Sequence, residues 1–393
     1  MKHNVFLSFI FLFISFYWVE SVYGSIRILH GPYLQNLKET EVTIVWLTDK
    51  PSIGWVELCP NDGTHFYVKE RPKFYDTTNG VKNTSLLHSV KLSGLKPGTS
   101  YRYRVYSTEV LSHKGVEIQY GSITGLDVWQ SDPPVFKTND SQKNETSFLV
   151  VNDIHGRTKD MINLFNVGKI RNKDLVFFNG DMLSILRSEE ELFTGFMDAS
   201  VDMFAKEIPM YYARGNHETR GLFATSFQNY FSPKESHLYY MFTQGPICFI
   251  VLDTGEDKPD SDIEYYGITD YDAYRSEQAL WLEKAIESDE FKKARYRVVV
   301  GHMPPAPKKQ IWHGPYEILT KIVPILNKAK IDVMLCGHLH EYLFIEKDDN
   351  INFPIVINSN DMVLTGKADQ DNLIIEIMSL DGKLVDHIKC SSH

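Results

Sequence analysis

The chain has few cysteines and no pattern that would tie them together. Its 393 residues include four, Cys59, Cys248, Cys336 and Cys390. No two of them are close in sequence, which excludes a zinc knuckle and a dithiol redox motif. Cys248 and Cys336 lie in apolar runs, where a thiol behaves as a small hydrophobic group. A disulfide is permitted but not implied.

An excess of basic residues is also lacking. Lys and Arg total 41 against 51 for Asp and Glu, giving a formal net charge of −10. A nucleic-acid polymer is therefore not expected as a partner, because binding to a phosphate backbone requires a basic face. A small anionic substrate remains compatible with this charge, since a bound metal ion can dominate the local field.

The longest apolar run is too short to span a membrane. It extends from Val5 to Trp18, below the ~20 residues that a spanning helix needs. A short positive start, Met1–Asn4, precedes it, and the small residue Gly24 follows before Ser25. This pattern predicts a signal peptide over residues 1–24, export to the periplasm or the exterior after cleavage, and no stable membrane span. An uncleaved signal anchor is the alternative.

The length predicts two domains. Residues 25–138 indicate a small all-β sandwich, with β-branched and aromatic runs at Glu41–Leu47, Trp55–Leu58 and Ser89–Leu92. A Pro97-Gly98 turn then leads into a strand that ends near Val105. Pro133-Pro134 and the polar run 139–145 are typical of a linker.

Residues 146–393 alternate between buried strands and helices. Strands are predicted at 147–152, 175–178, 211–212, 247–252, 297–300, 333–335 and 354–357, and helices near 161–170, 189–206 and 276–285. This alternation predicts an α/β domain in which helices flank a layered sheet.

Metal-type ligands follow five of these strands. Their side chains are carboxylate, amide or imidazole groups, and they comprise Asp153, His155, Asp181, Asn216, His302, His338 and His340. The carboxyl ends of strands in open α/β sheets are where ligands gather. Mixed oxygen and imidazole donors suit Fe, Mn or Zn better than Ca or Mg. His338 and His340 are two residues apart, and in an extended chain their side chains would point to opposite sides, so one could serve each of two ions.

Glycines precede Asp181, Asn216, His302 and His338. Because glycine has no Cβ, the backbone at these positions can approach an ion or a neighbouring loop closely.

The ordered set Asp-x-His, Gly-Asp, Gly-Asn-His-Glu, His and Gly-His-x-His, from Asp153 to His340, resembles the calcineurin-like metallophosphoesterase superfamily. The β domain ahead of it, whose segment 95–105 is similar to a fibronectin type III domain, and the run 337–342 resemble the purple acid phosphatase branch. The resemblance implies a layered mixed β-sheet sandwich flanked by helices, the metallophosphoesterase fold, preceded by a small fibronectin III-like sandwich. The all-β domain is expected over residues 25–138 and the metallophosphoesterase domain over residues 146–393.

The resemblance also implies a role for each residue of the set. One ion would be held by Asp153, His155 and His340, and a second by Asn216, His302 and His338, with Asp181 bridging the two. A hydroxide bridging the ions would attack phosphorus. His217 would protonate the leaving group, and Glu218 would orient a neighbour. Arg214 is expected to contact phosphate in a bidentate manner, and His313 to be an additional substrate-binding residue.

Two positions depart from the purple acid phosphatase pattern. The colour-giving tyrosine of that branch, three residues after the Gly-Asp aspartate, is replaced by Ser184 here. That branch also lacks the histidine that this chain has at position 155. A colourless protein is therefore predicted.

The leading functional hypothesis is an exported dinuclear-metal phosphatase that acts on small phosphomonoesters. The alternatives are a phosphodiesterase for nucleotides or phospholipid headgroups, and a non-catalytic binding module on a phosphatase scaffold. The tyrosines of segment 255–276, Tyr265, Tyr266, Tyr271 and Tyr274, could stack on a substrate ring or simply pack.

Overall fold

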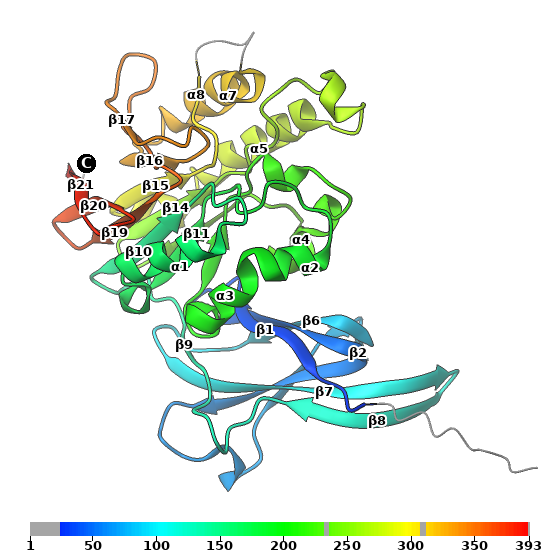
Figure 1. The fold of residues 1–393 in the computed structure, drawn as a ribbon. Coiled ribbons are helices and arrows are strands. Elements are labelled where there is room, and N and C mark those ends of the chain that lie inside the picture. The colour runs from blue at the N-terminus through cyan, green and yellow to red at the C-terminus, as the bar shows by residue number, and fades with distance from the viewer. Residues whose placement is uncertain (1–23, 232–235, 307–311, 392–393) are drawn as a thin grey trace, which may run out of the picture.

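The computed structural model describes residues 24–231, 236–306 and 312–391 (Figure 1). The predicted signal peptide therefore lies outside the described residues, apart from Gly24. Within the described ranges, no helix combines the length and the apolar character needed to cross a membrane.

The first part of the described chain is all-β and lies at the bottom of Figure 1 in blue and cyan. One seven-stranded sheet contains β1 (Ile28–Gln35), β2 (Glu41–Pro60), β3 (Lys73–Tyr75), β6 (Ser85–Ser93), β7 (Ser100–Lys114), β8 (Glu117–Gly125) and β9 (Val135–Lys137). A small hairpin joins β4 (Thr77–Thr78) to β5 (Val81–Lys82).

The strand β2 covers both of the strands predicted within 41–58. Its first half pairs with β1 and β6 and its second half pairs with β3 and β7, with a register shift between Leu47 and Ser52. Trp46 is fully buried in the core of this part, and its indole N–H donates to Ser107 Oγ over 3.0 Å. One long strand thus ties the two halves of the domain together.

The second part contains two six-stranded mixed sheets. The first has the order β12-β11-β10-β19-β20-β21 and the second β13-β14-β15-β16-β18-β17. The strands are β10 (Thr146–Val151), β11 (Leu175–Phe178), β12 (Met210–Tyr212), β13 (Tyr240–Gln244), β14 (Ile247–Val251), β15 (Tyr296–Val300), β16 (Val333–Cys336), β17 (Leu343–Ile345), β18 (Ile355–Ile357), β19 (Met362–Ala368), β20 (Asn372–Ser379) and β21 (Leu384–Ser391).

Side-chain alternation along the strands produces the layers. In β10, Phe148 and Val150 face the core between the two sheets, whereas Leu149 and Val151 face a helical layer. In β15, Val298 and Val300 belong to the central core and Val299 to the core on the other side. The predicted layered α/β sandwich, preceded by an all-β domain, is therefore confirmed as the fold class.

Helices cover the outer faces of both sheets. They are α1 (Thr158–Val167), α2 (Glu189–Leu192), α3 (Asp198–Ser200), α4 (Gln228–Phe231), α5 (Tyr271–Ala285), α6 (Asp289–Lys293), α7 (His313–Glu317) and α8 (Val323–Leu326). The helix predicted over 189–206 runs without a break, but its segments Phe193–Met197 and Val201–Ala205 are wider π-helical turns. The helix predicted at 276–285 begins earlier, at Tyr271.

Tyrosine hydroxyls join the two parts of the chain. Tyr33 donates to the carbonyl of Tyr230 over 3.2 Å, Tyr103 to that of Lys206 over 2.8 Å, and Tyr211 to that of Leu37 over 2.9 Å. Tyr33, Val45 and Leu47 also belong to the hydrophobic core beneath α1. The four cysteines are buried and free, so the structure contains none of the permitted disulfides.

Close packing across β10 and β19 predicts a stability effect. Phe148 lies opposite Gly366, and a Cβ on Gly366 would come within 2.0 Å of the Phe148 ring. Gly366→Ala is expected to reduce the free energy of unfolding by ~1–3 kcal/mol, because the ring must shift within a filled core. Gly301→Ala is the matched control, since its Cβ would make only ordinary contacts at 3.5 Å. Equal losses for both variants in urea denaturation would contradict this account.

Candidate metal centre

The loops that follow the parallel strands meet at the carboxyl ends of the two sheets. Asp153 and His155 follow β10, Asp181 follows β11, and Asn216 lies beyond β12. From the second sheet, His302 follows β15, and His338 and His340 follow β16. Backbone hydrogen bonds join these loops, from the N–H of Asp153 to the carbonyl of Gly180 over 2.9 Å and from the N–H of Gly337 to that of His302 over 2.8 Å.

Two glycines allow the loops to approach each other closely. A Cβ on Gly215 would lie 2.2 Å from Asp181 Oδ1, and one on Gly337 would lie 2.6 Å from Asp153 Oδ2. Any side chain at either position would displace a carboxylate. Gly301, expected to act in the same way, makes only ordinary contacts at 3.5 Å.

One group of ligand-type atoms surrounds Asp153. Its Oδ1 lies 3.1 Å from His340 Nε2 and 4.0 Å from His155 Nε2, and the two imidazole nitrogens are 3.2 Å apart. The other carboxylate oxygen, Oδ2, accepts hydrogen bonds from the Asn152 side chain and from the N–H of His338, both over 2.8 Å. Asp153 is thus fixed through one oxygen and presents the other to the two histidines.

A second group lies beside the first. His302 Nε2 is 3.1 Å from Asp181 Oδ2 and 3.9 Å from Asp153 Oδ1. His338 Nδ1 lies 3.1 Å from Asn216 Oδ1. Asp181, His302 and His338 together satisfy the spacing of a metal-ion site, as do Asp153, His155 and His340. All seven residues of the predicted set therefore converge, in two adjoining groups.

Three of these ligand-type atoms are buried without a hydrogen bond, as expected for atoms that bind cations. Asp153 Oδ1, His302 Nε2 and His338 Nε2 are buried and have no hydrogen-bond partner in the described part of the protein. An uncompensated buried polar atom costs free energy unless another group satisfies it. His302 also donates from Nδ1 to the carbonyl of Asn179 over 2.8 Å, which leaves the Nε2 lone pair directed to the centre.

The backbone is strained at five of the seven residues. Asp153, His155, Asp181, His338 and His340 all have φ between 49° and 72°, a region that non-glycine residues rarely occupy. His338 and His340 are therefore not extended as predicted, although they contact different groups. Such strain concentrates at functional sites, where the surroundings enforce it.

Electrostatics at the centre also favour positive charge. Burial raises the pKa of Asp153 and Asp181. His302, together with His340 at Asp153 and His217 at Asp181, outweighs burial, and both pKa values lie below their usual range. Burial alone would lower the pKa of His302, yet Asp181 and Asp153 raise it to about 10. The carboxylates therefore stabilise a cation beside them, whether a proton or a metal ion.

His217 lies at the edge of the two groups. Its Nδ1 contacts the Ser184 carbonyl over 2.7 Å, so this nitrogen is the donor. Its Nε2 lies 3.8 Å from Asp181 Oδ2, and its backbone N–H donates to Asp181 Oδ1 over 2.9 Å. The imidazole is thus held by Nδ1, and Nε2 faces the centre.

Arg214 and His313 contact acidic side chains that lie outside the seven-residue set. The Arg214 guanidinium contacts buried Asp253 through Nη2 at 2.8 Å and Nε at 3.2 Å. His313, at the start of α7, contacts Asp272 Oδ1 through Nε2 at 2.7 Å. Acidic side chains occupy donors of both residues, and the phosphate contact and the substrate contact predicted for them stay predictions.

The tyrosines of segment 255–276 differ in their surroundings. The hydroxyl of Tyr265 donates to Glu256 over 2.9 Å and that of Tyr274 to Asp253 over 2.9 Å. Tyr266, in contrast, is 88% exposed. For Tyr265 and Tyr274 these contacts favour the packing interpretation.

Other residues support the seven-residue set. Glu218, predicted to orient a neighbour, is fully buried and accepts from the N–H groups of Asp181, Leu183 and Gly215 at 2.8–3.2 Å. The others were not singled out from the sequence. Asn152 and Asn179, one or two positions ahead of the aspartates, contact Asp153 and His302. The repeated asparagine at the ends of β10 and β11 is a signal that could have found them. Trp312, whose ring centroid is 5.7 Å from that of His338, had no such signal.

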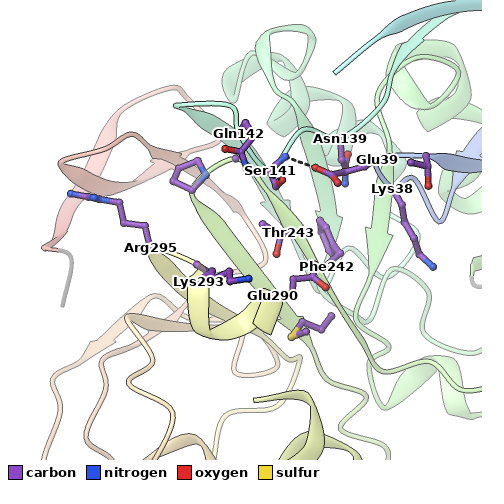
Figure 2. A pocket seen from close by; sticks show the side chains of 15 residues that line it. Lys38, Glu39, Asn139, Ser141, Gln142, Phe242, Thr243, Glu290, Lys293 and Arg295 are labelled. Atoms are coloured by element: carbon purple, nitrogen blue, oxygen red, sulfur yellow. Dashed lines mark hydrogen bonds between the residues drawn. The ribbon is translucent and has the colours of Figure 1, made fainter. Parts of the chain in front are cut away.

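A separate cleft lies where the two parts of the chain meet (Figure 2). It has a volume of about 710 Å³ and is lined by residues of the β domain, the linker and the α/β domain, including Lys38, Ser141 and Lys293. The N–H of Ser141 donates to Glu39 Oε1 over 2.7 Å, the contact drawn in Figure 2. Its described lining includes no residue of the seven-residue set, so the cleft is distinct from the metal centre.

Comparisons with known proteins agree with this arrangement. Residues 146–342 match the family described as Calcineurin-like phosphoesterase, and residues 32–116 match the Purple acid Phosphatase, N-terminal domain. The chain is 26% identical over 296 residues to purple acid phosphatase 21 of Arabidopsis thaliana, a match that covers 70% of this chain and 58% of that protein. The chain thus spans less than two thirds of the length of this relative.

One solved structure is similar over most of the chain. Purple acid phosphatase PPD1 from yellow lupin (Lupinus luteus) seeds aligns with a TM-score of 0.63 at 16% identity, covering 92% of this chain and 74% of that one. At this level of identity the similarity establishes a shared fold.

The convergence of ligand atoms predicts stabilisation by metal. Mn²⁺ added to metal-stripped protein is expected to raise the thermal unfolding midpoint, because an ion that binds only the folded chain adds about 2.7 kcal/mol at a hundredfold excess over its dissociation constant. Asp181→Asn should abolish most of that rise in a differential scanning measurement.

Asp272→Asn is the matched control. Asp272 belongs to another carboxylate–histidine cluster, with His313 and Glu317. There Arg275 and Lys321 already contact the acids at 2.8–3.7 Å. An equal Mn²⁺ response in wild type and Asp181→Asn would contradict the assignment.

Proposed function

The chain belongs to the calcineurin-like phosphoesterase family, and from this membership we propose that it is a metal-dependent hydrolase of small phosphate monoesters. The observation that carries the proposal is the convergence of seven carboxylate, amide and imidazole side chains, with three of their buried atoms unsatisfied. A binding module on an inactive scaffold is disfavoured, because nothing is missing from the ligand set.

We infer that Asp153, His155 and His340 hold one ion and that Asn216, His302 and His338 hold the other. Asp181 is the residue proposed to bridge them, since it lies between the groups and contacts His302. Mixed oxygen and imidazole donors suit Fe, Mn or Zn. Two ions of this kind supply a nucleophile from water and neutralise the charge of the phosphate oxygens.

His217 is the proposed proton donor. Because Nδ1 is committed to the Ser184 carbonyl, the proton to be transferred is carried on Nε2. As the bond between phosphorus and the ester oxygen breaks, that oxygen takes the proton from Nε2 and leaves as an alcohol.

We further infer that the protein is exported and colourless. Export is supported by the apolar run 5–18, which lies outside the described residues. The absence of colour is supported by Ser184, which stands where the coloured phosphatases have tyrosine and whose Oγ lies 3.3 Å from His155 Nδ1.

Loss of the proton donor should depend on the leaving group. His217→Ala is expected to lower kcat on phenyl phosphate by ~10²–10⁴-fold, because a basic leaving oxygen requires a proton. The loss on p-nitrophenyl phosphate should be smaller, since p-nitrophenolate leaves more readily without one. Metal content, measured by elemental analysis, should not change.

His387→Ala is the control, because His387 lies on β21 and is half exposed. Bis-p-nitrophenyl phosphate tests the diesterase alternative. Faster turnover of the bis-ester than of the monoester would overturn the monoesterase proposal, and no turnover of either ester would favour the binding module.

A further inference from the structure

Two arginines flank the segment that carries Asn216 and His217. Arg214 precedes it and Arg220 follows it, and each meets a carboxylate in the loop after β14. Arg214 contacts Asp253, and Arg220 contacts Glu256 through Nε at 2.8 Å and Nη2 at 2.7 Å. We refer to the ion pairs Arg214–Asp253 and Arg220–Glu256 as the arginine clamp.

Both acids of the clamp are buried. Asp253 is 0% exposed and Glu256 is 1% exposed. A bidentate arginine–carboxylate pair fixes direction as well as distance, because two parallel hydrogen bonds define the plane of the fork. The clamp therefore constrains the segment 214–220 at both of its ends.

Further contacts transmit this constraint to the metal centre. Thr219 Oγ1 lies 2.6 Å from Glu256 Oε1 and 2.6 Å from the carbonyl oxygen of Asn216, and its single hydroxyl proton is donated to one of these two acceptors. At the other end, Arg214 is two residues from Asn216. The amide of Asn216 and the imidazole of His217 thus lie between two fixed points.

The acids are themselves held by α5. Tyr274 donates to Asp253 Oδ2 over 2.9 Å, and Gln278 pairs with the backbone of Asp253 on both its N–H and its carbonyl, at 2.9 and 2.7 Å. Arg275 donates to the carbonyls of Thr254 and Glu256. The clamp is therefore anchored to a 15-residue helix rather than to another loop.

We propose that the arginine clamp is a positioning device that sets Asn216 as a metal ligand and His217 as a proton donor, an inference that rests on the proposed function. Neither arginine touches substrate in this account. A misplacement of about 1 Å in a catalytic group can cost on the order of 10²-fold in rate, and loss of a residue that orients a ligand typically costs 10–100-fold in metal affinity.

The test uses Arg220→Gln and Arg220→Lys in the full chain, because the Arg220 side chain is 28% exposed and its loss is the less severe for folding. Arg214→Lys, which keeps the charge but not the fork, is the second site. Arg297→Gln is the matched control, since Arg297 also holds loops through backbone carbonyls but lies near the opposite end of β15 from His302.

Three readouts separate positioning from general stability. Arg220→Gln should weaken Mn²⁺ binding about 10-fold and accelerate amide hydrogen exchange in residues 215–219 of the metal-free protein. It should also lower turnover of phenyl phosphate more than that of p-nitrophenyl phosphate. Arg220→Lys should restore part of each, and Arg297→Gln should change none of the three.

Proportionate losses on both esters, with unchanged Mn²⁺ affinity and exchange, would overturn the clamp as a positioning device. If the wild type hydrolyses neither ester, the proposed function fails instead. The Mn²⁺ and exchange measurements then still decide whether the clamp positions the segment.

Discussion

Buried carboxylate and imidazole atoms that lack a hydrogen bond are the constraint on which the rest of the structure depends. Asp153 Oδ1, His302 Nε2 and His338 Nε2 are hidden from water and make no hydrogen bond within the described residues. Leaving each such atom unsatisfied costs about 1–3 kcal/mol, and five neighbouring residues also hold strained backbone angles. Bound cations at this place would offset those costs, because they satisfy the free oxygen and nitrogen atoms together.

The architecture of the two sheets brings these groups together. Parallel pairing of β10, β11 and β12 directs three loops to one edge, and parallel pairing of β14, β15 and β16 directs others to the adjoining edge. Since the sheets share a hydrophobic core, the two edges are fixed relative to each other. Glu218 and the arginine clamp then help to fix the loop after β12.

Local sequence patterns sufficed to predict much of this. Apolar strands followed by Asp, Asn or His indicated which residues would converge, because strand ends are recognisable from short segments and their common edge follows from the α/β pattern. The strands β19, β20 and β21 were not predicted. They extend the first sheet beside β10 in antiparallel fashion. The Asp381-Gly382 turn between β20 and β21 is a hairpin pattern that could have indicated the last of these pairings.

The partners of long charged side chains could not be predicted either. Arg214 contacts Asp253, 39 positions away in the sequence, and His313 contacts Asp272, 41 positions away, and neither pairing was predicted. Which acid meets which base is decided by the packing of α5 and α7 against the loop after β14, and not by any neighbouring residue.

Anomalous diffraction from Mn²⁺-soaked crystals tests the central claim most directly. The account predicts two peaks, one among Asp153, His155 and His340 and one among Asn216, His302 and His338, on either side of Asp181. Manganese bound elsewhere on the chain, with no peak among these seven residues, would contradict it.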